Sequence, residues 1–238
     1  MITSKDNEKL KLVRRLHERK HREREGLFAT EGEDLLAAGL AAGLEPQLVL
    51  SEAGSGLAGE EVERELLDSA SALGSGSRVI ALWPIRWREE APAPVCVYLH
   101  AVSDPGNVGA VIRTTQALVA GGVALGPGCA DPYSPKAVRA SMGAIFATLP
   151  ARCDLTATPA PRIALLAHGG EALRAPGQPL TVCLGAERDG LPAEVVAACD
   201  ETWTIPLRPG AAESLNVAAA AAIALERISS AAAELGQA

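Results

Sequence analysis

The chain has 238 residues, which is enough for one large or two modest domains. Hydrophobic residues make up 48% of the chain, so a sizeable core can be buried. Aromatic residues make up only 3%, so platforms for stacking single-stranded bases are scarce. The net charge of −7 argues against a generic basic coat for nucleic acids.

Charge is nevertheless distributed unevenly along the chain. The first 30 residues hold nine Lys and Arg against five acids, a local charge of +4. Since the whole chain carries −7, the remainder carries −11. A basic segment on an acidic body predicts a localised contact with a polyanion. A solvated helix with mixed charges would explain the same run equally well.

The five cysteines show neither a Cys-x-x-Cys pair nor nearby histidines at metal-binding spacing, so we expect no metal. Thiols in apolar surroundings suit a reducing compartment. Apolar runs stay shorter than the roughly 20 residues of a membrane span. The charged N-terminal segment does not resemble a secretory signal. Together these features predict a cytoplasmic protein.

Residues 1–83 predict a small α/β domain, because short strands alternate with helices. Helical patterns cover residues 7–24, 33–42 and 60–73, and the expected strands cover residues 27–30, 48–50 and 78–82. The proline-rich residues 84–94 are predicted to form an interdomain linker, which prolines would stiffen.

Residues 95–238 predict a larger α/β domain with a parallel sheet covered on both faces. Apolar runs typical of buried strands alternate there with helical patterns. The strands are expected at 95–99, 122–125, 163–167, 180–184 and 202–205, and the helices at 108–120, 136–147, 192–198 and 214–235. In such sheets, ligands bind beyond the carboxyl ends of the strands.

Three of these strand exits carry residues suited to chemistry. The first reads Asp104-Pro-Gly-Asn-Val-Gly-x-x-x-Arg-Thr. Asn107 is predicted to cap the helix that follows, and Arg113 presents a rigid fork of donors suited to phosphate. A surface ion pair would be an ordinary alternative role for Arg113.

The second exit reads Leu184-Gly-Ala-Glu-x-x-Gly-Leu-Pro. Gly185 permits a tight turn against a ligand, and Glu187 is expected either to cap the next helix or to anchor Arg113. The third exit reads Ile205-Pro-Leu and continues to Ser214-Leu-Asn-Val, where Ser214 is predicted to be a helix N-cap.

Taken in order, these three segments resemble the motifs of the SpoU (TrmH-type) RNA ribose 2′-O-methyltransferases of the SPOUT superfamily. The resemblance spans roughly residues 95–227, and Ser134-Pro-Lys-Ala-Val-Arg-Ala-Ser-Met-Gly-Ala resembles the family's segment between the first two motifs. More loosely, the N-terminal half is similar to the family's ribosomal-protein-like substrate-binding domain. The resemblance implies a C-terminal trefoil knot, a homodimer and S-adenosylmethionine as the methyl donor.

The resemblance also implies roles for individual residues. The polar site would consist of Asn107, Arg113, Glu187, Ser214 and Asn216. The cofactor would contact Gly185, Ile205, Leu207, Leu215 and Asn216. RNA would contact Arg14, Arg15, Arg19, Lys20, Arg22 and Arg139. Arg113 is expected to grip a phosphate and to stabilise the forming alkoxide, since a guanidinium normally stays protonated.

The expected substrate is structured RNA, with 23S ribosomal RNA favoured and transfer RNA as an alternative. A non-catalytic protein that binds RNA or the cofactor on the same scaffold is a second alternative, although a pure binder would not need all five polar residues. A nicotinamide dehydrogenase predicts Gly-x-Gly-x-x-Gly after a strand, which the chain lacks. A further alternative is an α/β protein whose loops only turn the chain. It would account for each glycine, but not for three motifs that occur in the family's order.

Overall fold

The computed structural model describes the chain except residues 75, 175–176, 209, 211–212 and 236–238, and it describes side chains as far as residue 230. The chain forms two compact units. Unit 1 consists of Met1–Arg86 with Asp131–Ala147, and unit 2 of Trp87–Ala130 with Thr148–Ala238.

Unit 1 is built on a four-stranded mixed sheet in the order β1-β4-β2-β3. β4 pairs antiparallel with both β1 and β2, and β3 pairs parallel with β2. The strands are β1 (Leu27–Glu31), β2 (Leu48–Glu52), β3 (Glu60–Val62) and β4 (Val79–Pro84). The helices of its N-terminal stretch are α1 (Glu8–Arg15), α2 (Arg19–Glu25), α3 (Glu33–Ala41) and α4 (Arg64–Ala70). The small α/β fold predicted for this half is confirmed.

The single helix predicted over residues 7–24 is wrong, because α1 and α2 are separated by a break after Arg15. At this break Arg22 reaches back, and its Nη1 donates to the carbonyl oxygens of Leu16 and His17 at 2.7 and 2.8 Å. Carbonyls at a helix end lack partners within the helix, so this side chain stabilises the interruption. The helix predicted over 60–73 is also shorter, since β3 occupies its first residues.

Residues 131–147 pack with the N-terminal stretch although they lie far along the chain. They form α6 (Pro135–Ser141) and α7 (Ala144–Ala147), with Phe146 edge-on to Trp83 at a centroid distance of 4.8 Å. The helix predicted over 136–147 is interrupted by Met142 and Gly143, whose φ angles of 48° and 89° are left-handed. Residues 131–147 therefore belong to unit 1, although residues 87–130, which precede them in the chain, belong to unit 2.

Unit 2 contains a seven-stranded parallel sheet in the order β7-β6-β5-β10-β8-β11-β9. Its strands are β5 (Val95–Leu99), β6 (Gly121–Leu125), β7 (Ala151–Arg152), β8 (Arg162–Leu166), β9 (Glu171–Ala172), β10 (Leu180–Leu184) and β11 (Glu201–Thr204). All five predicted strands are present. β7 and β9 were not predicted, because two residues at a sheet edge leave no periodic pattern to detect.

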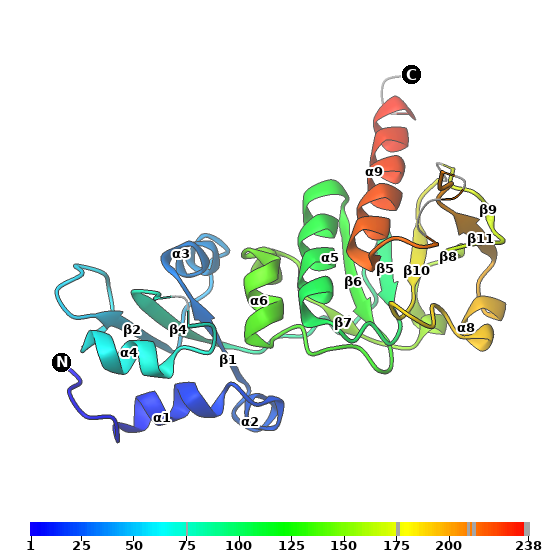
Figure 1. The fold of residues 1–238 in the computed structure, drawn as a ribbon. Helices are drawn as coiled ribbons and strands as arrows, with labels where there is room; N and C mark the ends of the chain where they lie inside the picture. Colours follow the sequence, from blue (N-terminus) through cyan, green and yellow to red (C-terminus); the bar gives the residue numbers. More distant parts are fainter. Residues whose placement is uncertain (75, 175–176, 209, 211–212, 236–238) are drawn as a thin grey trace. The chain divides into compact units, whose positions relative to one another are not determined.

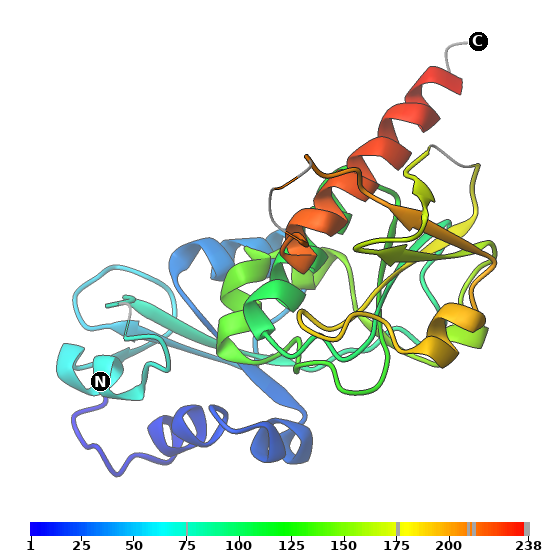
Figure 2. The same ribbon diagram turned by 45° about the vertical axis from the view of Figure 1, so that its right-hand side comes forward.

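The helices of unit 2 are α5 (Pro105–Leu118), α8 (Ala193–Ala197) and α9 (Val217–Leu235), with a 3-10 turn at Leu155–Ala157. α5 and α9 lie side by side in both ribbon views (Figures 1 and 2). The buried positions of α9 are Val217, Ala221, Ala224, Leu225 and Ile228. Three or four residues separate most of these positions, so they form one helical stripe against the domain.

Among the residues that the structure describes, no helix combines the length and the apolar character that a membrane crossing needs. Part of the third predicted exit, residues 209 and 211–212, lies outside the described residues.

Candidate active site

A cleft opens beyond the carboxyl ends of β8, β10 and β11, as expected for a parallel sheet. Its walls come from residues 165–167 and 184–188 with Gly190, from Ile205 and Leu207 after β11, and from Ser214, Leu215 and the first turn of α9. The predicted residues that line it are Gly185, Glu187, Ile205, Leu207, Ser214 and Leu215. Two of the three predicted exits therefore meet in one cleft.

Position 185 requires a glycine because the backbone of Gly190 lies too close to leave room for a side chain. A Cβ at this position would lie 2.1 Å from the carbonyl carbon of Gly190, which is shorter than real contacts allow. The approach is closed by two backbone bonds, because Ala186 and Gly190 each donate an N–H to the other's carbonyl, at 3.1 and 3.0 Å. The tight turn predicted at Gly185 is therefore present, and Gly185 also lines the cleft.

The first predicted exit forms the entrance to α5. Asp104 is the N-cap of this helix, and its Oδ1 accepts the backbone N–H of Asn107 at 3.0 Å. The prediction that Asn107 caps the helix is therefore wrong. Pro105 occupies the first helical turn, where it needs no donor. Because the backbone of Asn107 is held by the cap, its side-chain amide is free to make tertiary contacts.

The third exit forms the entrance to α9, and here too the cap differs from the prediction. Asn216, not Ser214, supplies it: its Oδ1 accepts the backbone N–H groups of Ala218 and Ala219 at 2.9 and 3.3 Å. Ser214 is exposed and lies two residues earlier on the wall of the cleft. An asparagine cap holds the helix entrance and leaves one side-chain NH₂ to donate elsewhere.

A chain of side-chain hydrogen bonds joins all three exits. The Nδ2 of Asn216 donates to the Oδ1 of Asn107 at 3.0 Å, and the Nδ2 of Asn107 donates to the Oε1 of Glu187 at 2.9 Å. These residues are 109 and 80 positions apart in sequence. Glu187 therefore binds Asn107 rather than a helix end or Arg113, the two roles considered for it from the sequence.

Arg113 lies on α5 but takes no part in this chain of hydrogen bonds. Six residues separate it from Asn107, which turns it about 120° around the helix and moves it about 9 Å along the axis. Its side chain is exposed, and it has no hydrogen-bond or ion-pair partner among the residues that the structure describes. A guanidinium in this state is available to a ligand or to another chain.

The predicted RNA-binding residues divide into exposed and buried groups, all within unit 1. Arg22 is only 3% exposed, and its Nε and Nη2 both donate to Asp131 Oδ2, at 2.9 and 2.7 Å. A side chain buried in this way cannot reach a phosphate, so the prediction that Arg22 binds RNA is corrected to a structural role.

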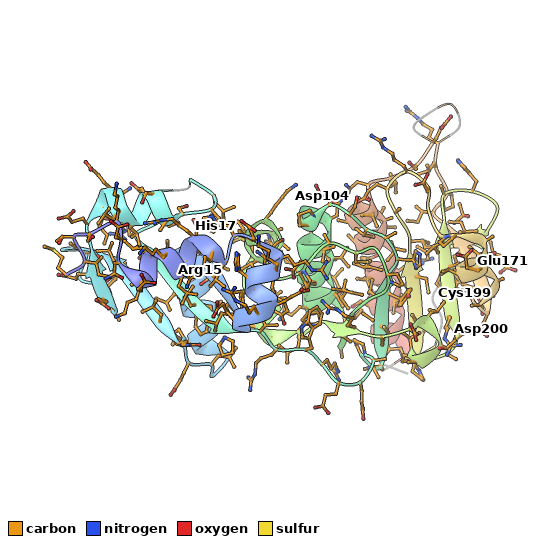
Figure 3. All side chains as sticks on the ribbon, turned by 90° about the horizontal axis from the view of Figure 1, so that it is seen from below. Arg15, His17, Asp104, Glu171, Cys199 and Asp200 are labelled. Carbon is orange, nitrogen blue, oxygen red and sulfur yellow. The ribbon has the colours of Figure 1, made fainter. Side chains whose placement is uncertain are left out.

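The remaining cations lie at or near the surface. Arg19 and Lys20 are exposed and pair with Glu23 and Glu18, on the same stretch of chain. Arg139 is also exposed, and its Nη1 lies 3.4 Å from Asp34 Oδ2. Arg14 and Arg15 are partly exposed: Arg14 donates to a backbone carbonyl, and Arg15 has a buried Nε without a partner in the described structure. Figure 3 shows Arg15 on α1. Exposed ion pairs are weak, so phosphate can replace the acids.

Two contributors to the cleft were missed from the sequence. Asp104 sets the position of Asn107, and an Asp followed by Pro three residues before Asn107 was a readable cap signal. Residues 165–167 at the end of β8 also line the cleft. They are apolar and carry no motif, so only the strand order, which places β8 beside β10, could reveal them.

Comparison with known proteins gives matches to both halves of the chain. A model of the SpoU rRNA Methylase family matches residues 94–226, and a model of the MRM3-like substrate binding domain matches residues 7–81. The 23S rRNA (guanosine(2553)-2'-O)-methyltransferase RlmP of Bacillus subtilis (strain 168) is 28% identical over 239 residues, covering 93% of this chain and 96% of the relative.

Two further proteins agree with these matches. The 23S rRNA (uridine(2479)-2'-O)-methyltransferase of Streptomyces viridochromogenes is 34% identical over 149 residues, covering 53% of this chain and 49% of the relative. The crystal structure of an AdoMet-bound rRNA methyltransferase from Sinorhizobium meliloti has a TM-score of 0.83 at 26% identity, covering 95% of this chain and 96% of that one.

Unit 2 thus has a cleft at its strand exits and three distant polar segments that side-chain hydrogen bonds join beside it. Together with the matches to a methylase family and to a substrate-binding domain, these features define an RNA-methylating enzyme. The chain belongs to the SpoU rRNA methylase family. This confirms the family and enzyme class that the three strand exits predicted, and the family membership implies the trefoil knot.

Proposed function

We propose that this protein transfers a methyl group from S-adenosylmethionine to a ribose 2′-hydroxyl of 23S ribosomal RNA. The observation that carries the proposal is the Asn216–Asn107–Glu187 hydrogen-bond chain at the edge of the cleft, which ties the three family segments together. The named 23S rRNA methyltransferases among the relatives support ribosomal RNA as the substrate. Action on ribosomal RNA also supports the predicted cytoplasmic location.

The residues of the cleft suit S-adenosylmethionine. Leu166, Leu184 and Ile205 provide an aliphatic wall for a planar base. Glu187 and Arg188 bring both charge signs to the lining, which suits a ligand that carries a sulfonium and an amino acid group. When bound, this cofactor supplies a methyl group already activated by the positive charge on its sulfur. The relative from Sinorhizobium meliloti was crystallised with AdoMet.

The chain's own residues must align the ribose and help its hydroxyl to lose a proton. Asn107 holds Glu187 in place, so the carboxylate keeps one orientation at the cleft. Arg113 binds the RNA phosphate next to the target ribose and stabilises the oxygen as negative charge develops. Alignment of the reacting groups alone lowers the barrier by several kcal/mol.

The cations of α1 and α2, with Arg139, dock the RNA by phosphate contacts, which position a nucleic acid without reading its sequence. The match of residues 7–81 to a substrate-binding domain supports this assignment. Arg22 is excluded from the set because it is buried.

A homodimer is part of the proposal. Ile223 on α9 is a large apolar side chain that is 42% exposed and does not line the cleft. A second copy covering this part of α9 would bury it. Ile223→Asp should then lower the mass measured by light scattering from two chains to one, and an unchanged mass would refute this interface.

The activity is tested by incubating total RNA with S-adenosylmethionine labelled in its methyl group. Arg113→Ala should lower incorporation by about 100-fold or more, while the cofactor dissociation constant stays within about two-fold of wild type. Gln116→Ala, exposed on the same helix, is the matched control and should retain wild-type incorporation. Substantial turnover by Arg113→Ala would refute the role of this arginine.

Mapping of 2′-O-methylated positions in RNA from cells with and without the protein then identifies the substrate. A position in 23S ribosomal RNA that loses its methyl group supports the proposal, whereas a position in transfer RNA would overturn the choice of substrate. No incorporation into any RNA by the wild-type protein would overturn the activity.

A further inference from the structure

Four of the five cysteines gather on one face of the parallel sheet. Cys96 and Cys183 are fully buried on β5 and β10, and Cys153 and Cys199 are half-buried and pack against the same cluster. The pairing of Cys183 with Tyr98 puts β10 and β5 in register, so these side chains share one face. Neither the cofactor cleft nor the polar chain uses these thiols.

Two of the thiols are already in contact. The Sγ atoms of Cys199 and Cys183 are 3.7 Å apart, and the Cys199 Sγ also lies 3.3 Å from the carbonyl oxygen of Val195 in α8. A disulfide bond needs a sulfur separation of about 2.05 Å, so the two atoms must approach by less than about 2 Å. Both thiols are free in this structure.

The two sulfurs differ in acidity and in access. The hydrogen bond with Cys199 and burial raise the pKa of the Cys183 thiol, whereas the same hydrogen bond lowers the pKa of Cys199. Cys199 also borders a surface hollow that it shares with Glu171, Asp200, Glu201 and Thr202. Figure 3 shows Cys199, Glu171 and Asp200 close together at this end of the sheet. Cys199 is therefore the thiol that an oxidant in solution meets first.

We propose that Cys199 and Cys183 form an oxidation site, in which a hydroperoxide oxidises Cys199 and Cys183 closes a disulfide. The Cys199 sulfur attacks one peroxide oxygen, the O–O bond breaks, and a sulfenic acid forms as the other oxygen leaves as water or an alcohol. The Cys183 sulfur then attacks the sulfenic sulfur, and the S–O bond breaks. The hydroxyl leaves as water with the Cys183 proton, so the dithiol loses two electrons and the peroxide gains them.

The charges around the hollow favour a small neutral oxidant. Glu171, Asp200 and Glu201 supply three carboxylates. Two cations lie nearby: Arg174 pairs with Glu171 and Glu201, and Arg162 lies close enough to act on both thiols, so one negative charge is in excess. This surplus of negative charge repels anionic disulfides and admits a hydroperoxide. The new bond would close a ring from residue 183 to residue 199, which encloses the Gly185–Gly190 loop of the cofactor cleft.

The test uses the full-length protein, hydrogen peroxide, alkylation of the remaining thiols and mass spectrometry of tryptic peptides. Cleavage after Arg and Lys, except before Pro, puts the five cysteines in five different peptides, with Cys183 in residues 175–188 and Cys199 in residues 189–227. Oxidised wild-type protein should yield these two peptides linked, and dithiothreitol should separate them. A different linkage, or none at peroxide concentrations that oxidise exposed methionine, would overturn the proposal.

Variants separate the roles of the two sulfurs. Cys183→Ser should stop at the sulfenic acid, trapped by dimedone on Cys199, and Cys199→Ser should leave Cys183 reduced. Cys129→Ser removes a thiol outside the cluster and should oxidise as wild type does. Dimedone labelling of Cys183 in Cys199→Ser, at the rate found for Cys199, would overturn the order of the steps.

Thermal unfolding reports whether the pair is already positioned for the bond. Oxidation should raise the melting temperature of the wild-type protein by about 5 °C, because the cross-link restricts the unfolded chain, and should leave Cys183→Ser unchanged. A fall in the wild-type melting temperature would show that the bond distorts the sheet, which contradicts a preformed pair. None of these measurements depends on methyl transfer, so the proposal can fail or succeed independently of the proposed function.

Discussion

The polar residues at the strand exits of unit 2 and the cations near the start of unit 1 were both predicted from the sequence, but they differ in the partners they find in the folded protein. Asn107, Glu187 and Asn216 come from distant segments and bind one another. Arg19 and Lys20 instead pair with acids nearby in sequence, and Arg22, two residues after Lys20, is buried against Asp131. A motif repeated at several strand exits therefore indicates a site more reliably than a run of like charges does.

The largest expected effect distinguishes the buried Arg22 from the exposed Arg19 by the loss of stability that each substitution causes. Arg22→Ala leaves the Asp131 carboxylate buried without its partner, so the free energy of unfolding should fall by about 3–5 kcal/mol. Arg19→Ala is the matched control on the same helix and should change it by less than about 1 kcal/mol. Urea unfolding followed by circular dichroism measures both. Equal effects of the two substitutions would contradict the structural role of Arg22.

The second prediction breaks the polar chain of unit 2. Asn107→Ala removes both links, so Glu187 and Asn216 lose their shared partner and methyl incorporation should fall about 10-fold to 100-fold. Since the side chain is at the surface, the free energy of unfolding should change by about 1 kcal/mol or less. Labelled methyl transfer and urea unfolding together test this. Wild-type activity in this variant would mean that catalysis does not depend on the hydrogen bonds of Asn107.

The third and smallest effect concerns the exposed cations. Arg19→Gln with Lys20→Gln should remove two phosphate contacts, so the plot of log affinity for RNA against log salt should become shallower by about 1.4–1.8. A filter-binding titration at several salt concentrations gives this slope. Glu23→Gln is the charge-neutralising control, and an unchanged slope in the double variant would place the RNA contact elsewhere.

Substitution is a cleaner test here than deletion of the N-terminal half. Phe146 packs against Trp83, and Asp131 is ion-paired with Arg22, so removal of the first 86 residues would expose the core of unit 1 on residues 131–147. A truncated chain would then lose RNA binding through misfolding as readily as through lost charge.

The sequence alone determined the two α/β halves, the five long strands of the parallel sheet and the polar residues at its exits. Continuous apolar runs and loop motifs are local properties, and a parallel sheet brings strand exits to one edge whatever the loop lengths. The same local logic led to the wrong cap at both helix entrances. Asp104 caps α5 in place of Asn107, and Asn216 caps α9 in place of Ser214. All four residues are of types that can cap a helix, so the backbone geometry decides which one does.

Tertiary structure alone decided what no local pattern encodes. It broke the first helix where Arg22 binds the carbonyls of Leu16 and His17, and it joined residues 131–147 to unit 1. It also linked Asn107 to Glu187 and brought Cys183 into contact with Cys199. Each of these features is a contact between residues that the chain separates. Propensity and periodicity describe neighbours in sequence, whereas burial and hydrogen bonding act between neighbours in space.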